Sequence, residues 1–255
     1  MNLNLMKYFR YFLLIIFLLP TLYSCKEEPV SSTEISVLID VTDKRFKDQD
    51  FIAENLPKFL KMMNLDKEAG GYSGGEIKLS LINEVSDSKS KMVKISPAKT
   101  GLMGENKLNR KDEVDRFYSN LEKSFSQLLN DANWGTNASK IYQKIARELI
   151  KMKSSDYDKK IMVIYSDMLE NSNLFSFYNT NWKTEVEKMT ANPETTLKEL
   201  SQNGPALPDL SEFEIYIITS RTPENDEKVN LSEQFWMTLL EFQGAKVTFN
   251  SDLEI

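Results

Sequence analysis

Apolar residues recur along this chain with two different spacings. Six short runs rich in β-branched and aromatic side chains predict β-strands, over residues 34–40, 76–83, 90–96, 160–167, 213–219 and 245–249. Between them, apolar residues at intervals of three and four predict helices over about 48–63, 114–129, 141–150 and 231–242. Pro57 is expected to kink or shorten the first helix. We expect a turn at the glycines of 70–75 and an exposed loop over 97–109.

The order of these elements predicts an α/β fold. Strands that alternate with helices form a doubly wound, mostly parallel sheet with helices on both faces. The second and third strands are joined only by residues 84–89, whereas parallel neighbours need a crossover of about a dozen residues or more. We therefore expect a six-stranded sheet with the third strand antiparallel at one edge.

Residues 1–24 are typical of a lipoprotein signal peptide. Two basic residues precede an apolar run, 11–20, which is shorter than the roughly 20 residues of a membrane span and ends in proline. The sequence Leu22-Tyr23-Ser24-Cys25 resembles a lipobox, which predicts that Cys25 carries a lipid anchor. An uncleaved N-terminal anchor is the alternative.

The polar residues 25–33 predict a short tether before a domain over 34–255. Lys26, Glu27 and Glu28 resemble the surface-export signals of Bacteroidota lipoproteins, which implies a protein on the outer membrane that faces outward. If these residues are only a solvated linker, the lipid-anchored domain faces the periplasm instead.

Composition excludes several kinds of chemistry. The chain of 255 residues has no histidine, which excludes Ser-His-Asp and Cys-His catalysis and zinc sites that need imidazole. Its single cysteine is Cys25, so the domain has no internal disulfide and no thiolate cluster. Two of the 32 basic residues lie in the leader, leaving 30 against 38 acidic residues, a formal charge of −8. We expect no binding of nucleic acid to such an acidic domain.

Oxygen-bearing side chains gather where two predicted strands end. Asp40, Thr42 and Asp43 follow the first strand, Thr136 lies in the loop before the helix that leads to the fourth, and Asp167 ends the fourth. The carboxyl ends of parallel strands share one edge of a sheet, where ligands bind. Carboxylates and hydroxyls are ligands for Mg²⁺ or Ca²⁺, so we expect a divalent metal site there. Helix capping by the aspartates is the alternative.

These residues and the element order resemble a von Willebrand factor A (vWA) domain over roughly 34–249. In that family a metal-ion-dependent adhesion site uses Asp-x-Ser-x-Ser, a loop threonine and a later aspartate. The resemblance implies that Asp40, Thr42, Thr136 and Asp167 hold Mg²⁺, or Mn²⁺ or Ca²⁺, and that a partner's carboxylate completes the coordination. The third motif position falls on Lys44. Asp43 could take its place, or Lys44 could leave the site free of metal.

The segment 168–212 is long for a connection between two neighbouring strands and predicts an insertion at the same edge of the sheet. It carries four aromatic residues among asparagines and serines: Phe175, Phe177, Tyr178 and Trp182. Such a composition is typical of recognition surfaces, and we take these four as candidate partner-binding residues. Packing of the same rings onto the domain is the alternative.

Three functions are compatible with these patterns. The first is a membrane-anchored binding module that holds a protein partner at the envelope, with no catalytic activity. The second is a metal-free structural scaffold of an envelope assembly. The third is a metal-dependent hydrolase, because Asp40-x-Thr42-Asp43 superficially resembles the Asp-x-Asp motif of haloacid-dehalogenase-type phosphatases; that motif needs an aspartate where this chain has Thr42.

Overall fold

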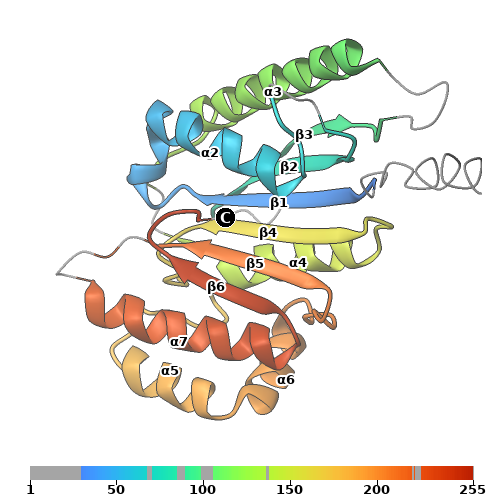
Figure 1. The fold of residues 1–255 in the computed structure, drawn as a ribbon. Coiled ribbons are helices and arrows are strands. Elements are labelled where there is room, and N and C mark those ends of the chain that lie inside the picture. The colour runs from blue at the N-terminus through green and yellow to red at the C-terminus, as the bar shows by residue number, and fades with distance from the viewer. Residues whose placement is uncertain are drawn as a thin grey trace, which may run out of the picture.

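A computed structural model describes residues 30–67, 71–84, 90–98, 106–135, 138–219, 221 and 225–254. The predicted leader, Cys25 and most of the tether lie outside these ranges. Six strands form one sheet: β1 (Ser32–Asp40), β2 (Gly74–Ile82), β3 (Ser90–Ile95), β4 (Lys159–Tyr165), β5 (Phe213–Ile218) and β6 (Lys246–Asn250). Their order is β3-β2-β1-β4-β5-β6, with β3 antiparallel to β2 and all other pairs parallel (Figure 1). The predicted sheet is confirmed, including its antiparallel edge strand.

Helices cover both faces of the sheet. They are α2 (Gln49–Met62), α3 (Lys107–Asn130), α4 (Ile141–Lys153), α5 (Trp182–Ala191), α6 (Pro193–Asn203) and α7 (Asp226–Phe242), with a short 3-10 helix η2 (Lys44–Lys47) after β1. Ile35, Val37 and Ile39 pack with α2 and α3, whereas Leu38 faces α4 and α7. Because side chains alternate along a strand, β1 is buried on both faces, as its continuous apolar run predicts.

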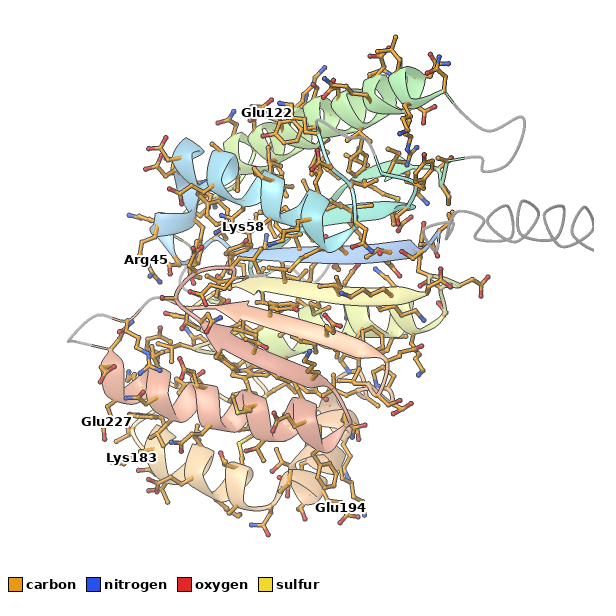
Figure 2. The ribbon with its side chains drawn as sticks, viewed as in Figure 1. Arg45, Lys58, Glu122, Lys183, Glu194 and Glu227 are labelled. Atoms are coloured by element: carbon orange, nitrogen blue, oxygen red, sulfur yellow. The ribbon has the colours of Figure 1, made fainter. Side chains whose placement is uncertain are left out.

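The chain path of the insertion was not predicted in detail. Residues 168–212 contain the helices α5 and α6, and α5 packs against α7 (Figure 1). Lys183 of α5 forms an ion pair with Glu227 of α7 at 2.6 Å (Figure 2). Pro193 begins α6, a position where proline is favoured because its missing N–H has no partner in a helix anyway. The insertion is therefore a helical layer outside α7.

Three element boundaries differ from the prediction. Gly74 and Gly75 belong to β2 and not to the preceding turn. Position 75 requires glycine, because a Cβ there would lie 1.9 Å from the carbonyl oxygen of Thr33 on the neighbouring strand. The predicted loop 97–109 overlaps α3, whose first turn is capped by Asn106 accepting from the N–H of Leu108 at 3.0 Å. Helix α2 runs through Pro57 without ending there.

Among the helices within the described ranges, none combines the length and the apolar composition needed to cross a membrane.

Candidate functional site

The candidate site lies at the carboxyl edge of the sheet between β1 and β4. These neighbours are paired in register from Thr33 with Lys159 to Ile39 with Tyr165, so the next residues, Asp40 and Ser166, lie side by side. The chain turns in opposite directions from these two strands, to β2 on one side and β5 on the other. In doubly wound sheets, this switch point is where ligands bind.

Asp40 is completely buried and accepts four hydrogen bonds. Its Oδ1 accepts from the N–H and the hydroxyl of Thr42, at 3.0 and 2.8 Å. Its Oδ2 accepts from the hydroxyls of Ser139 and Ser166, at 3.0 and 2.7 Å. Burial raises the pKa of Asp40, and these four donors oppose the rise. Every described donor is neutral. The hydrogen bonds therefore stabilise a carboxylate at Asp40, but no positive charge among these donors balances its negative charge.

Asp167 lies in the turn that follows β4. Its Oδ1 accepts from the N–H of Leu169 at 3.0 Å. Burial raises the pKa of Asp167 to about 7, and the nearby Asp40 and Asp43 add to the rise, whereas the N–H of Leu169 and the charge of Arg45 oppose it. The two predicted strand-end aspartates therefore come together, and their charges disfavour each other.

The turn around Asp167 is held by an unusual backbone conformation. Met168 has a φ of 59°, which is uncommon for a residue with a side chain. Its N–H donates to the hydroxyl of Ser166 at 2.9 Å, and its carbonyl accepts from Ser232 at 2.7 Å and from Trp236 Nε1 at 2.9 Å. These contacts from α7 fix the direction of the chain after β4. They therefore also fix the position of Asp167.

Two buried residues of this region were missed from the sequence. Glu170 is completely buried, and its Oε2 accepts from the N–H of Tyr142 at 2.8 Å, in the first turn of α4. Burial raises the pKa of Glu170 to about 8, against the hydrogen bonds it accepts. Ser139, the second, pairs through its backbone with Asn171 at 3.0 and 3.3 Å. The only available signal was position, since each lies three residues beyond a predicted site residue.

Thr136, the predicted loop ligand, lies outside the described residues. The residue before it, Gly135, donates its N–H to the carbonyl of Val41 at 2.9 Å. This bond holds the described end of that loop against the end of β1, beside Asp40.

The cationic residues after β1 change the predicted role of Asp43. Its carboxylate accepts from the N–H of Arg45 at 3.1 Å and pairs with the guanidinium through Nε at 2.8 Å and through Nη2. Arg45 lies at the carboxyl edge of the sheet (Figure 2). Asp43 therefore forms both a cap and an ion pair with Arg45, and as a metal ligand it stays a prediction. Lys44 extends over the loop, since a Cβ on Gly135 would lie 3.2 Å from its Cε and 3.8 Å from its Nζ.

The remaining residues fit a divalent cation by their donor chemistry. Asp40, Asp167 and the hydroxyl of Thr42 offer the hard oxygen atoms that Mg²⁺ or Ca²⁺ prefers. Within the described part of the chain, no three acidic side chains gather around one point. A site of the vWA type needs only two carboxylates, because hydroxyls supply the other protein ligands.

The four candidate partner-binding aromatics divide into two pairs. Phe175 and Phe177 are 7% and 0% exposed and pack on Phe235 of α7, so the structure removes both from the predicted surface. Tyr178 is 57% exposed, and the Nζ of Lys228 lies 4.6 Å from its ring centre and 5.5 Å from that of the half-buried Trp182.

Tyr178 follows a short segment in which Asn171 pairs with Ser139 and with Ser176. Burial of its hydroxyl end, and then the charges of Asp167 and Asp40, raise its pKa to about 12. Tyr178 therefore lies near the two aspartates of the candidate site.

The strand order and the single antiparallel edge strand are those expected from the vWA resemblance. The chain has a vWA-like fold. No family model matches the sequence, and no curated protein matches it either. Only solved structures provide comparisons.

The similar structures come from different kinds of protein. The vWF domain of the type V pili tip protein Mfa5 from Porphyromonas gingivalis is 9% identical, with a TM-score of 0.43 over 87% of this chain and 91% of that one. The PilB minor pilin from Streptococcus sanguinis is 10% identical, with a TM-score of 0.45 over 90% and 59%. The human COPII-coat protein Sec24c is 10% identical, with a TM-score of 0.42 over 89% and 31%. This chain thus spans less than two thirds of PilB and of Sec24c, and similarity this low says nothing about site residues.

Proposed function

We propose that this chain is a non-catalytic protein-binding module that recognises its partner at the carboxyl edge of the sheet. One observation carries the proposal: the buried Asp40 and the half-buried Asp167 lie together at the switch point, and among the described residues neither forms an ion pair with a lysine or arginine. A buried carboxylate without a cationic partner is costly, and carboxylates with strongly raised pKa values cluster at functional sites.

A divalent cation is the ligand that best suits these groups. Asp40, Thr42, Thr136 and Asp167 would hold it, with Ser139 and Ser166 orienting Asp40 through their hydroxyls. When bound, Mg²⁺ supplies a positive centre at which an acidic side chain of the partner can dock. Tyr178, which lies near the two aspartates, would contact the partner there, together with Trp182, which shares the cation of Lys228 with it.

A lipid on Cys25 would fix the orientation of the module. β1 begins at Ser32, so the amino edge of the sheet is tied to the tether. The strand has nine residues, and at about 3.3 Å per residue the site lies roughly 30 Å from that edge. Anchored in the outer membrane by Cys25, the domain would present Asp40 and Asp167 away from the lipid.

Thermal unfolding with added Mg²⁺ tests the metal. An ion that binds only the native state raises the melting temperature, and Asp40→Ala combined with Thr136→Ala should abolish the rise. Asp112→Asn, an exposed carboxylate on α3, is the control that should keep it. Absence of any rise in the wild type, with Mg²⁺, Mn²⁺ and Ca²⁺ in turn, would reject the metal.

Recovery of a partner tests the binding role. The lipidated chain is isolated from its own envelope with and without a chelator. A partner that is retained by the wild type and released both by the chelator and by Asp40→Ala with Thr136→Ala supports recognition at this edge. Equal recovery by all forms would locate the binding elsewhere on the domain.

One observation favours the metal-free scaffold as a second candidate. The side chain of Lys44 lies over Gly135, so its ammonium can supply the positive charge that a metal would bring. In that case divalent ions leave the melting temperature unchanged, and partner recovery does not respond to a chelator.

A further inference from the structure

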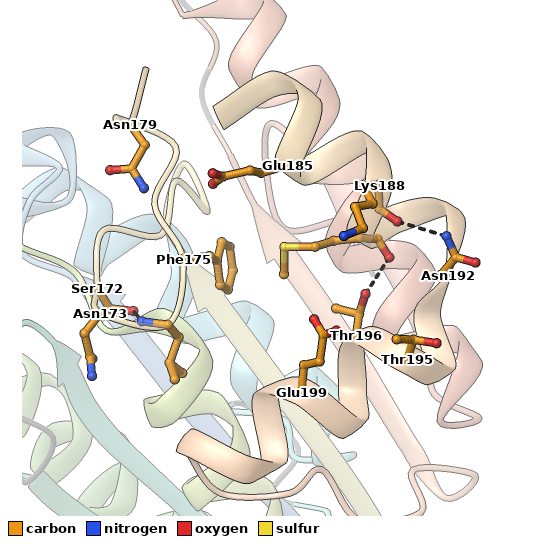
Figure 3. A pocket seen from close by; sticks show the side chains of 12 residues that line it. Ser172, Asn173, Phe175, Asn179, Glu185, Lys188, Asn192, Thr195, Thr196 and Glu199 are labelled. Atoms are coloured by element: carbon orange, nitrogen blue, oxygen red, sulfur yellow. Dashed lines mark hydrogen bonds between the residues drawn. The ribbon is translucent and has the colours of Figure 1, made fainter. Parts of the chain in front are cut away.

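The insertion contains a pocket of its own. A cavity of about 520 Å³ lies between the turn that follows Glu170 and the helices α5 and α6 (Figure 3). It is lined by Ser172, Asn173, Leu174, Phe175, Asn179, Glu185, Lys188, Met189, Asn192, Thr195, Thr196 and Glu199. The volume lies within the range of about 300–1,000 Å³ that is usual for ligand sites. None of these residues belongs to the strand-edge site.

Hydrogen bonds within the protein fix the walls of this pocket before any ligand binds. Thr196 donates to the carbonyl of Met189 at 2.9 Å, and Asn192 Nδ2 donates to that of Lys188 at 3.3 Å, which fixes the junction of α5 and α6 (Figure 3). On the other wall, the N–H of Ser172 donates to the carbonyl of Phe175 at 3.2 Å. A pocket with fixed walls loses little conformational entropy when it binds.

The charged groups of the pocket are not used by these bonds. Glu185 of α5 and Glu199 of α6 are exposed and border the pocket on two sides of Phe175 (Figure 3). Neither carboxylate forms an ion pair with a lysine or arginine in the described part of the chain. Lys188 also lines the pocket, so its formal charge is −1.

The rest of the lining suits a peptide. Asn173, Asn179 and Asn192 each carry an amide that can both donate and accept, as the backbone of an extended segment requires. Phe175 and Met189 provide an apolar floor, and an aromatic face also attracts a cation.

We propose that this pocket binds a lysine- or arginine-bearing peptide segment, with the basic head between Glu185 and Glu199 and its aliphatic stem along Phe175 and Met189. Charge-assisted hydrogen bonds to the two carboxylates would give the pocket its preference. The proposal shares with the proposed function only the premise that the ligand is a protein. It requires neither Asp40 nor a metal.

Peptide titration monitored by NMR tests the pocket directly. The full-length chain in detergent is labelled with ¹³C on its methionine methyl groups, and the Met189 signal is assigned with Met189→Leu. The probes are Gly-Arg-Gly and Gly-Lys-Gly, acetylated and amidated, with Gly-Gln-Gly and Gly-Glu-Gly as references. We expect the Met189 signal to shift with the basic peptides at up to about 10 mM and not with the references. Glu185→Gln with Glu199→Gln should weaken this response at least about tenfold, as expected when two charge-assisted bonds are lost.

A matched pair on the same two helices provides the control. Glu187→Gln with Glu194→Gln removes two exposed carboxylates that do not line the pocket and should leave the response unchanged. Asp40→Ala should also leave it unchanged, so a failure of the strand-edge site does not affect this test. The proposal is overturned if the Met189 signal does not respond to the basic peptides or responds equally to glutamine. It is also overturned if only a neutral oligosaccharide such as maltotriose shifts it, because that would make the pocket a carbohydrate site.

Discussion

Both ends of the same sheet contain buried carboxylates, and their surroundings differ. At the amino half, each glutamate has a basic neighbour: Glu76 pairs with Lys94 and Glu148 with Lys78, both at 2.5 Å. Glu34 accepts from Ser155 and lies near Lys160, its neighbour across β1 and β4, although burial and the charges of Glu76 and Glu148 raise its pKa. At the carboxyl edge, Asp40, Asp167 and Glu170 accept hydrogen bonds from neutral described donors alone.

This difference distinguishes carboxylates with a structural role, in the amino half of the sheet, from carboxylates that suit a binding site, at the carboxyl edge. Glutamates that are paired with lysines complete their own electrostatics and need no ligand. The carboxyl edge orients Asp40 with four hydrogen bonds from neutral donors, and no ion pair with a described lysine or arginine balances its charge. Such an arrangement suits a site that a cation completes, whether an external ion or the ammonium of Lys44, and each variant below changes one side of this contrast.

The largest expected effect is that of Asp40→Ala. The alanine removes the acceptor for the N–H and hydroxyl of Thr42 and for the hydroxyls of Ser139 and Ser166. Buried donors without partners cost about 1–3 kcal/mol each, and partial relaxation leaves an expected loss of about 4 kcal/mol in the free energy of unfolding. Urea unfolding without divalent ions, followed by tryptophan fluorescence, measures it.

The conservative replacement Asp40→Asn is the control for that measurement. Asparagine keeps one acceptor oxygen and the shape of the side chain, so it should cost clearly less than alanine. If Asp40→Ala were as stable as the wild type, the cost of burying the Asp40 charge would equal or exceed the stabilisation by its four hydrogen bonds.

Glu148→Leu tests the amino half. Glu148 is 2% exposed and its partner Lys78 is 15% exposed, so the variant leaves a largely buried lysine without its carboxylate. We expect a loss of about 3 kcal/mol in the same urea experiment. Lys78→Met added to Glu148→Leu should recover most of it, since an apolar pair of similar volume replaces the ion pair. Equal losses of unfolding free energy in the single and double variants would show that Glu148 stabilises the fold through packing and not through its charge.

The residues of the carboxyl edge could be predicted from the sequence only in part, and the ion pairs of the amino half could not be predicted. Asp40 and Asp167 could be found because strand-end positions in a parallel sheet meet at one edge whatever the loops do. Ser139 and Glu170 could not, because their contacts depend on how two loops pair, and loop pairing leaves no periodic signal in the sequence. The amino-half ion pairs were missed for the same reason: Lys78 and Glu148 belong to a strand and a helix whose mutual register only packing determines.

The insertion shows a second limit of sequence reasoning. Phe175 and Phe177 have the composition of a recognition surface, and the same composition is equally compatible with a core, which is where they lie. Helix starts leave clearer signals in the sequence than the surroundings of an aromatic side chain do. Asn106 before α3 and Pro193 at the start of α6 are both ordinary start signals.

A smaller effect is expected from pH. The pKa of Glu170 is about 8 in the folded chain and 4.5 in the unfolded one, so the native state holds the extra proton between these values. The free energy of unfolding should therefore fall as pH rises from about 5 to about 8 in metal-free buffer. Asp167 adds to the fall in the same direction, through its pKa of about 7.

Glu170→Gln isolates the contribution of Glu170. Glutamine stays neutral at every pH and retains an acceptor for the N–H of Tyr142, so the pH dependence of the urea midpoint should flatten. Glu122→Gln, an exposed position on α3, is the matched control and should keep the wild-type slope (Figure 2). An unchanged slope in Glu170→Gln would mean that Glu170 is already ionised in the fold and that its charge is balanced after all.

The smallest expected effect, and the one that decides how the carboxyl edge is completed, is that of Lys44→Ser. If the Lys44 ammonium competes with an external cation, serine removes the competitor and adds a hydroxyl at the third motif position. Mg²⁺ at about ten times its Kd would then stabilise the variant by about 1.4 kcal/mol, more than it stabilises the wild type. Lys47→Ser, exposed on the same 3-10 helix, changes the net charge equally and should behave like the wild type. A response shared by both variants would be a general effect of charge. A response confined to Lys44→Ser would mean that this chain carries its own substitute for a metal and that Lys44 controls access to Asp40 and Asp167.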